Sequence, residues 1–303
     1  MAFDLYFAGA RNKFADDHLL KLGANRLQSQ LIDRKNIEIW CREKSHKNKL
    51  FVDSGAYTAY TKGISVDADD YIEYLNSLTD SLTIFAQLDK IPGMFNRPKT
   101  KQEMYEAPIK SWENYLYMRS RLKEPKKLLP IFHQGEDFKH LINMLEWTDE
   151  KGEHIPYIGV SPAFDLPGLE NFLDMSFDII RNSSNPNVKT HAFGMTRLDI
   201  LEKYPYTSAD STSWKLCAAM GSIYTPWGTI YVSERGKYSK DYIFNQSKDA
   251  VNNIKKYINE QGFSVEDVAK YDYIRYIINI NYLVDWARNY IYLGKSKSKK
   301  RLF

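Results

Sequence analysis

Cysteine is scarce in this sequence of 303 residues. The only two cysteines, Cys41 and Cys217, lie far apart and form no CxxC pair. Neither a disulfide framework nor a cysteine-rich zinc site can be built from them. We therefore expect hydrophobic packing to hold the fold together.

Long apolar runs are missing as well. No stretch approaches the roughly 18 consecutive apolar residues of a membrane span. The start, MAFDLYFAGARNKF, lacks the charged segment and apolar core of a secretion signal. These absences predict a cytoplasmic protein without a membrane segment. A hydrophobic content of 43% and a charged content of 26% are those of an ordinary globular protein.

Positive charge is present only in modest excess. The formal net charge is +4, and basic residues concentrate in 34–49, 119–127 and 295–301. Such clusters suit phosphate contacts, although a charge run is more often a solvated surface. The 22 tyrosines and 6 tryptophans are less ordinary, because aromatic faces stack on nucleic-acid bases as well as fill cores.

Short apolar runs of the buried-strand type recur along the chain, each followed by a polar turn and a segment of helical period. They predict strands at 4–9, 49–54, 82–89, 127–134, 155–161, 188–194, 206–211 and 228–233. Segments such as 68–80 and 138–152 predict helices between them. Eight strand–helix units favour an α/β fold of the (β/α)₈ TIM-barrel type. No GxGxxG turn supports an open doubly wound sheet.

The region after the predicted barrel is helical in pattern. Residues 247–262 and 264–294 predict two helices, and Ser264 and Asp267 fit a capping box before the second. We expect a barrel domain over 1–240, a helical C-terminal extension over 241–294 packed on the barrel, and a basic tail over 295–303. No internal repeat or low-complexity linker interrupts this plan.

Polar residues stand where the predicted strands end. An active site in such a barrel is built from the carboxyl ends of its strands. Taken singly, each of these residues is typical of a helix cap or a turn. Three carboxylates at one barrel end repel one another, however, so they indicate a ligand, a metal or an acid/base role. The candidate residues are Asp53, Ser54, Gly55, Asp89, Gln134, Gly135, Gly159, Gly194, Met195 and Asp210.

The order of these strand-end motifs resembles a known family. DSGAYTA (53–59), QLD (87–89), HQG (133–135), IGVSPA (158–163), FGM (193–195) and ADS (209–211) follow in sequence. This series is similar to that of the tRNA-guanine transglycosylase superfamily. The resemblance implies exchange of a guanine base through a covalent glycosyl-aspartate.

The resemblance also implies a role for each residue. Asp210 matches the nucleophile, and Asp53 matches the carboxylate that exchanges protons with the leaving and entering bases. Asp89 and Gln134 match the groups that read the purine edge, and Gly159 matches a backbone donor to the base carbonyl. The remaining matches are the apolar walls of the base, Tyr57 and Met195, and the turn residues of the pocket, Ser54, Gly55, Gly135 and Gly194.

One departure from the tRNA enzymes concerns their zinc site. They carry a zinc site of three cysteines and a histidine near the C-terminus, and no cysteine or histidine follows Cys217 here. We therefore expect no zinc and no other cofactor. Short relatives without zinc resemble the DNA-guanine transglycosylases (DpdA type), which are often phage-encoded. This likeness predicts that a 7-deazaguanine such as preQ0 is inserted into DNA, in the host cytoplasm if a phage encodes the protein.

Several alternatives remain open from the sequence. Within the class, the alternative substrate is tRNA, read without the zinc subdomain. A metal-dependent barrel hydrolase is a second interpretation, with Asp53, Asp89, His133, His191 and Asp210 as ligands. A non-catalytic nucleic-acid-binding protein is a third. The sequence does not determine the oligomeric state or the incoming base.

Overall fold

The computed structural model describes residues 3–10, 13–42, 48–78, 83–163, 166–195 and 197–294. The predicted basic tail, 295–303, lies outside the described residues. Within them, nine strands form one parallel sheet in the order β5-β4-β3-β2-β1-β9-β8-β7-β6. These strands are β1 (Asp4–Ala8), β2 (Asn25–Ser29), β3 (Leu50–Asp53), β4 (Thr83–Ala86), β5 (Leu128–Leu129), β6 (Ile131–His133), β7 (Tyr157–Ser161), β8 (Lys189–Ala192) and β9 (Ser208–Ser211).

The sheet closes at Pro130. Strands β5 and β6 are the two ends of the strand order, yet only this proline separates them in the chain. β5 pairs with β4, and β6 pairs with β7. Proline has no N–H, but its carbonyl oxygen accepts a hydrogen bond from the amide of Gly159 at 2.7 Å. The TIM-barrel-like α/β fold that the sequence predicts is therefore confirmed.

One predicted barrel strand is wrong, and another was missed. Residues 228–233 do not enter the barrel, because β10 (Ser222–Thr225) and β11 (Gly228–Tyr231) form a separate antiparallel hairpin. The missed strand is β2, whose Arg26 and Gln28 are buried polar residues, and Arg26 pairs with Asp16 of α1 at 2.6 Å. These side chains hide the apolar pattern that identifies a buried strand.

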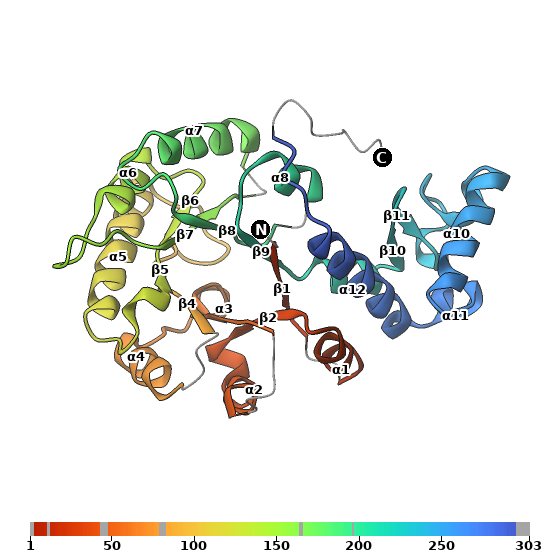
Figure 1. The fold of residues 1–303 in the computed structure, drawn as a ribbon, viewed down its shortest axis with the longest axis horizontal. Helices are drawn as coiled ribbons and strands as arrows, with labels where there is room; N and C mark the ends of the chain where they lie inside the picture. Colours follow the sequence, from red (N-terminus) through yellow and green to blue (C-terminus); the bar gives the residue numbers. More distant parts are fainter. Residues whose placement is uncertain are drawn as a thin grey trace.

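Helices surround the barrel (Figure 1). The main hydrophobic cluster lies between them and the outer face of the sheet, and it contains Leu5, Val52 and Ile158. The helices of this layer are α1 (Lys13–Leu22), α2 (Gln30–Arg42), α3 (Ala56–Lys62), α4 (Ala68–Ser77), α5 (Lys101–Arg119), α6 (Phe138–Glu146), α7 (Leu169–Arg181), α8 (Leu198–Lys203), α9 (Ser213–Ala219) and the C-terminal part of α12 (Asp272–Arg288). A short 3₁₀ turn, η1 (Pro125–Lys127), leads into β5.

Alternate strand residues point into the barrel, because side chains change face at every position. Tyr6, Phe51, Leu129, Ile131 and Tyr157 form a separate cluster there. This apolar layer fills the middle of the barrel. Asp53 follows Phe51 by two positions and therefore points to the same interior, one layer nearer the carboxyl ends of the strands.

A smaller unit stands at one side of the barrel (Figure 1). The hairpin, α10 (Lys248–Glu260), α11 (Val265–Lys270) and part of α12 (Asp272–Arg288) share a hydrophobic cluster of their own. Two 3₁₀ turns, η2 (Glu234–Gly236) and η3 (Ile243–Asn245), connect its parts. This packing unit begins before residue 241, and the helix predicted over 264–294 is divided at Tyr271. In the described residues, no helix has the length and apolar character that crossing a membrane requires.

Candidate active site

Three carboxylates gather at the carboxyl end of the barrel. Asp53 ends β3, Asp89 lies just beyond β4, and Asp210 lies in β9. With β2 counted, and with β5 and β6 taken as one strand interrupted at Pro130, these are the third, fourth and eighth barrel strands. The charges of Asp210 and Asp89 both act on Asp53 and raise its pKa. The structure thus brings together the three aspartates that the sequence selected.

Asp53 is a carboxylate that can exchange a proton near neutral pH. Burial, together with the charges of Asp210 and Asp89, raises its pKa to about 6. The amide of Gly55 opposes this shift by donating a hydrogen bond to Oδ2 at 2.9 Å. A general acid/base works best when its pKa lies close to the working pH. Asp53 meets this condition.

The turn after Asp53 requires glycine. Gly55 has a φ of 79°, and a Cβ atom there would lie 2.6 Å from Cβ of Leu31. The preceding Ser54 is buried, and its hydroxyl oxygen lies 3.4 Å from the amide of Ala56. We interpret Ser54 and Gly55 as residues that shape the turn, and their place in a substrate pocket stays a prediction.

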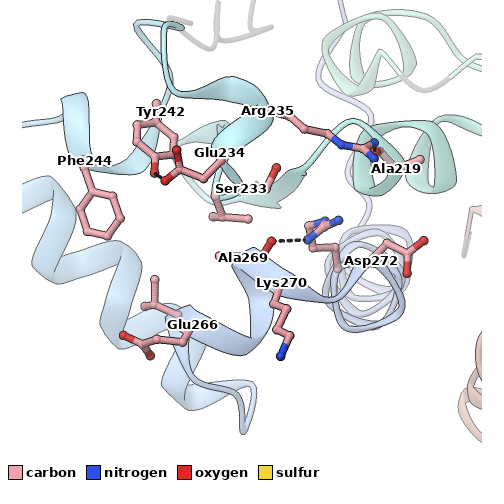
Figure 2. A pocket seen from close by; sticks show the side chains of 13 residues that line it. Ala219, Ser233, Glu234, Arg235, Tyr242, Phe244, Glu266, Ala269, Lys270 and Asp272 are labelled. Atoms are coloured by element: carbon pink, nitrogen blue, oxygen red, sulfur yellow. Dashed lines mark hydrogen bonds between the residues drawn. The ribbon is translucent and has the colours of Figure 1, made fainter.

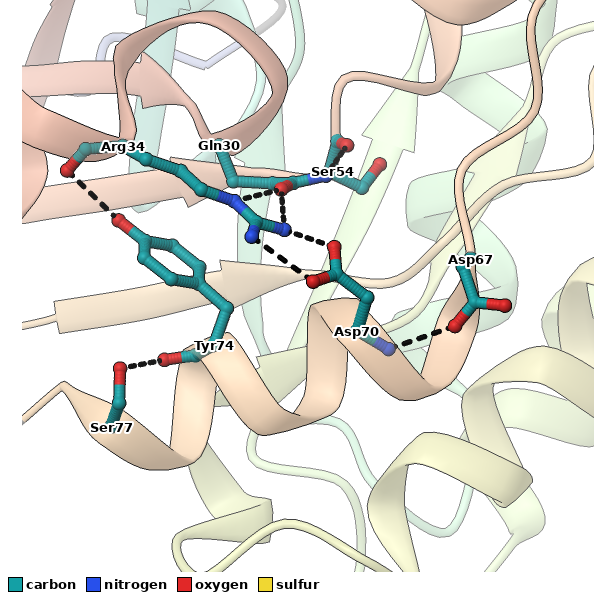
Figure 3. A network of polar contacts seen from close by, with 7 residues as sticks. All are labelled: Gln30, Arg34, Ser54, Asp67, Asp70, Tyr74 and Ser77. Atoms are coloured by element: carbon teal, nitrogen blue, oxygen red, sulfur yellow. Dashed lines mark hydrogen bonds and ion pairs between the residues drawn. The ribbon is translucent and has the colours of Figure 1, made fainter.

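A polar network connects this turn to α2 and α4 (Figure 3). The buried Gln30 of α2 donates a hydrogen bond from Nε2 to the carbonyl oxygen of Ser54 at 2.9 Å. Its Oε1 accepts a bond from Nε of Arg34 at 2.9 Å, and Arg34 also pairs with Asp70 of α4. Two helices are thereby tied to the turn that carries Asp53. Sequence reasoning missed Gln30, because a glutamine in a helix carries no signal of such a partner.

Asp210 is held through only one of its two oxygens. Oδ1 accepts a hydrogen bond from the amide of Gly194 at 3.0 Å and lies 3.1 Å from Nε2 of His191. Within the described residues, Oδ2 has no hydrogen-bond partner. The side chain is 10% exposed. One oxygen is therefore fixed, and the other remains available for chemistry.

Asp89 is paired with a cation. Its Oδ2 lies 3.1 Å from Nε2 of His133, and Oδ1 accepts a bond from Gln87. Burial lowers the pKa of His133, but the charge and hydrogen bond of Asp89, with a further contribution from Glu136, outweigh it and raise this pKa to about 9. Burial raises the pKa of Glu136 to about 7. His133 thus supplies the positive charge that a group of carboxylates needs.

A cavity of about 1130 Å³ opens beside Asp89. It lies between α3, the segment 90–95 and α5, and several of its apolar side chains face solvent, among them Ile64, Met94 and Phe95. Phe95 also meets Tyr60 edge to face, with 5.9 Å between the ring centroids. Such a cavity has the mixed apolar and polar lining of a small-molecule site.

Two of the predicted substrate contacts need correction. Gly159 lies in the middle of β7, and its amide already donates to Pro130 within the barrel, so it is not available to a base carbonyl. Met195 is fully buried in the cluster between sheet and helices, so it does not form a wall of the site. Phe193, two positions earlier, points into the barrel instead and is only partly buried.

The other predicted contacts lie at the barrel mouth. The amide group of Gln134 is occupied: Nε2 donates to the carbonyl oxygen of Pro167 at 3.0 Å, and Oε1 accepts from the amide of Ala163 at 3.1 Å. Gly135 follows in a turn with a φ of 99°. Tyr57 is 68% exposed on α3. Base contacts by these three residues stay predictions.

Comparison with known proteins gives no family for this chain. No family model matches it, and no curated protein does. In the described residues, no group of three or more His, Cys, Asp or Glu side chains has the arrangement to hold a metal ion. The function must therefore be argued from the geometry of the site.

A separate hollow of about 550 Å³ lies in the smaller unit, between η2, η3 and α11 (Figure 2). Arg275 is buried there and donates hydrogen bonds to the carbonyl oxygens of Ala218, Val268 and Ala269. These carbonyls belong to the ends of α9 and α11, so we interpret Arg275 as a structural residue. None of the site residues that the sequence selected lines this hollow.

Proposed function

We propose that this chain is a guanine transglycosylase that exchanges guanine in DNA for a 7-deazaguanine base. The observation that carries the proposal is the pair of Asp53 and Asp210. One is partly buried and has a pKa of about 6, and the other has one oxygen fixed and one free at the same barrel end. Double displacement at a sugar carbon needs a nucleophile and a proton carrier with these properties.

The first displacement opens the glycosidic bond. A lone pair on Oδ2 of Asp210 forms a bond to C1′ of the nucleotide, while the C1′–N9 bond breaks and its electron pair leaves with guanine. Asp53, in its protonated form, donates its proton to the departing base. The products of this step are a covalent glycosyl-aspartate and neutral guanine.

The second displacement reverses the first with a new base. The incoming 7-deazaguanine forms the C1′–N9 bond as the C1′–Oδ2 bond breaks, and the electron pair returns to Asp210. The carboxylate of Asp53 takes the proton that the incoming base loses from N9. Two displacements retain the configuration at C1′, as in retaining glycosidases.

The surrounding residues support binding of a purine. The carboxylate of Asp89 keeps free lone pairs besides its bonds to Gln87 and His133, and it can accept hydrogen bonds from the N–H groups of guanine. The ring of Phe193 offers an apolar face in place of Met195. A base inside a duplex cannot reach such a pocket while it is stacked, so the nucleotide has to be flipped out or single-stranded.

DNA is the polymer that we propose, with tRNA as the alternative. The support is the absence, from the sequence after Cys217, of the cysteines and histidine that form the zinc site of the tRNA enzymes. The net charge of +4 suits either polymer.

Exchange of labelled guanine tests the proposal. The protein is incubated with radiolabelled guanine and either DNA or tRNA, and we expect label in DNA. Asp210→Asn should lower the rate by at least about 10³-fold, because the nucleophile is lost. Asp249→Asn, an exposed aspartate on α10, is the matched control and should behave as the original protein.

Three other outcomes separate the alternatives. Label in tRNA alone would contradict the choice of DNA. A metal ion in the purified protein, together with a hydrolytic activity that chelation removes, would favour the metal-dependent hydrolase. Nucleic-acid binding without label in either polymer would support the non-catalytic interpretation.

A further inference from the structure

A chain of buried polar side chains runs inside the barrel behind Asp210. The hydroxyl of Tyr157 on β7 contacts Oγ of Ser208 on β9, and this oxygen lies 2.5 Å from Nδ1 of His191 on β8. Nε2 of the same imidazole ring reaches Oδ1 of Asp210 at 3.1 Å. Ser208 and His191 are fully inaccessible to solvent. The two side chains in the middle of the hydrogen-bond chain are therefore shielded from solvent.

With Asp210 ionised and the His191 ring neutral, the hydrogen bonds of this chain have one consistent direction. An ionised carboxylate only accepts, so Nε2 of His191 must carry the proton that bonds to Asp210. Nδ1 of the neutral ring is then an acceptor, and it receives the hydroxyl proton of Ser208. Oγ of Ser208 in turn accepts from Tyr157. Burial raises the pKa of Tyr157, so its hydroxyl keeps the proton that it donates.

Aromatic rings hold the imidazole in this orientation. The ring of His191 packs against Phe51 and Phe193, with centroid distances of 4.7 and 4.5 Å, and Tyr6 meets it at 5.9 Å. A ring packed in this way cannot turn over without displacing the apolar layer of the barrel. Its two nitrogens therefore keep their partners.

We propose that Tyr157, Ser208 and His191 form a directed hydrogen-bond chain that fixes the Nε2–H tautomer of His191 and makes Oδ2 of Asp210 the reacting oxygen. His191 and the amide of Gly194 both bind Oδ1, so only Oδ2 is free to attack. His191 is thus a positioning residue. The catalytic part of this inference rests on the proposed transglycosylase activity, whereas the tautomer does not.

The hydrogen-bond chain behind Asp210 should affect how fast the covalent intermediate is released. After attack through Oδ2, Oδ1 is the carbonyl oxygen of an ester that keeps both N–H donors. When the incoming base forms its bond to C1′, the C1′–Oδ2 bond breaks and negative charge returns to the carboxylate. Donors on Oδ1 stabilise that charge, so their loss slows release of the intermediate more than its formation.

The ¹⁵N chemical shifts of the His191 ring test the arrangement without any substrate. We expect a protonated Nε2 and an unprotonated, hydrogen-bonded Nδ1 at neutral pH, assigned by comparison with His191→Gln. Ser208→Ala should move the Nδ1 shift toward that of a free acceptor, and Tyr157→Phe should move it less. A proton on Nδ1 overturns the inference, whatever the activity of the protein.

Kinetics test the effect on Asp210. In the exchange assay, His191→Phe should lower kcat about 10- to 100-fold, the range seen when a group that orients a reacting ligand is removed, with little change in KM. The denaturation-resistant adduct between protein and nucleic acid should persist longer than with the original protein. His191→Gln, which keeps a donor near Oδ1, should recover part of the rate.

The outcomes distinguish this inference from the proposed function. Wild-type turnover and adduct lifetime in folded His191→Phe overturn the positioning role while the transglycosylase stands. If His191→Phe does not fold, Ser208→Ala carries the kinetic test, and an unchanged adduct lifetime overturns the role. If the original protein exchanges no base, the proposed function is wrong, and the ¹⁵N shifts still decide the tautomer.

Discussion

The ring of Phe193 lies against the backbone of Gly159, so closely that a Cβ atom at residue 159 would be 2.6 Å from Cε2 of that ring. Ile131 closes the same space from the neighbouring strand, with Cγ2 at 3.1 Å. The absence of a side chain in the middle of β7 therefore lets an aromatic ring enter the top of the barrel. This relationship gives Gly159 a packing role in place of the hydrogen-bond role that the sequence suggested.

Gly159→Ala should destabilise the protein by about 1–3 kcal/mol, because the added methyl group overpacks the barrel interior. Urea unfolding measures the change. Combining it with Phe193→Leu should recover most of the loss, since the smaller side chain leaves room for the methyl group. Equal stability of the single variant and the original protein would contradict the packing that we describe.

Asp53 should make the protein less stable as the pH rises. Its folded pKa of about 6 lies above the ordinary value of 3.8, so the folded state binds more protons between these values. Unfolding free energy should therefore fall between about pH 4 and pH 6. Asp53→Asn should remove this decline and gain about 3 kcal/mol at pH 7, the order expected from a shift of this size.

The matched control for Asp53→Asn is Asp249→Asn, whose side chain is exposed. Loss of this charge from the first turn of α10 should cost less than about 1 kcal/mol, and the decline between pH 4 and pH 6 should remain. Asp53 is not the cause of the decline if the unfolding free energies of Asp53→Asn and the original protein change in parallel from pH 4 to pH 8. In the exchange assay, Asp53→Asn should be strongly impaired despite its higher stability.

The ion pair of His133 and Asp89 should change the stability of the protein in a higher pH range. The folded pKa of His133, about 9, exceeds the ordinary value of 6.5, so the pair contributes stability that is complete below pH 6.5 and lost as the pH rises through 9. The histidine side chain is 38% exposed, so solvent screens the pair, and we expect a loss of only about 1 kcal/mol.

Chemical denaturation at pH 6 and pH 9.5 measures this loss. Asp89→Asn should flatten the difference between the two pH values, because the histidine then has no anionic partner at Oδ2. A pH dependence that survives Asp89→Asn unchanged would assign it to other groups.

Gln30 lies outside the site, but we expect it to stabilise the turn that positions Asp53. Gln30→Leu leaves the buried carbonyl oxygen of Ser54 without its donor, which should cost about 1–3 kcal/mol. It should also lower the exchange rate, because the turn that positions Asp53 loosens. Asp70→Asn is the control: it breaks an exposed ion pair of the same network and should cost less than about 1 kcal/mol.

Equal effects of Gln30→Leu and Asp70→Asn would argue against a special role of the bond to Ser54. Thermal unfolding and labelled-guanine exchange, measured on the same preparations, separate lost stability from lost positioning.

The sequence alone determined the barrel and most of its strands. Alternating short apolar runs and helical segments require a parallel sheet covered by helices, and the carboxyl ends of such strands must meet. This rule was sufficient to select Asp53, Asp89 and Asp210 and to place them on one end of the fold. It failed at β2, where Arg26 and Gln28 occupy buried positions, and at β11, where an apolar run belongs to a hairpin.

Only the tertiary structure decided what each residue at that end contacts. The occupied amide of Gly159, the burial of Met195, and the links from Gln30 to Ser54 and from His191 to Asp210 join segments far apart in the chain. No local pattern encodes such contacts, because they depend on which strands become neighbours when the sheet closes. Residue type and spacing thus located the three aspartates, and barrel closure determined the partners of each.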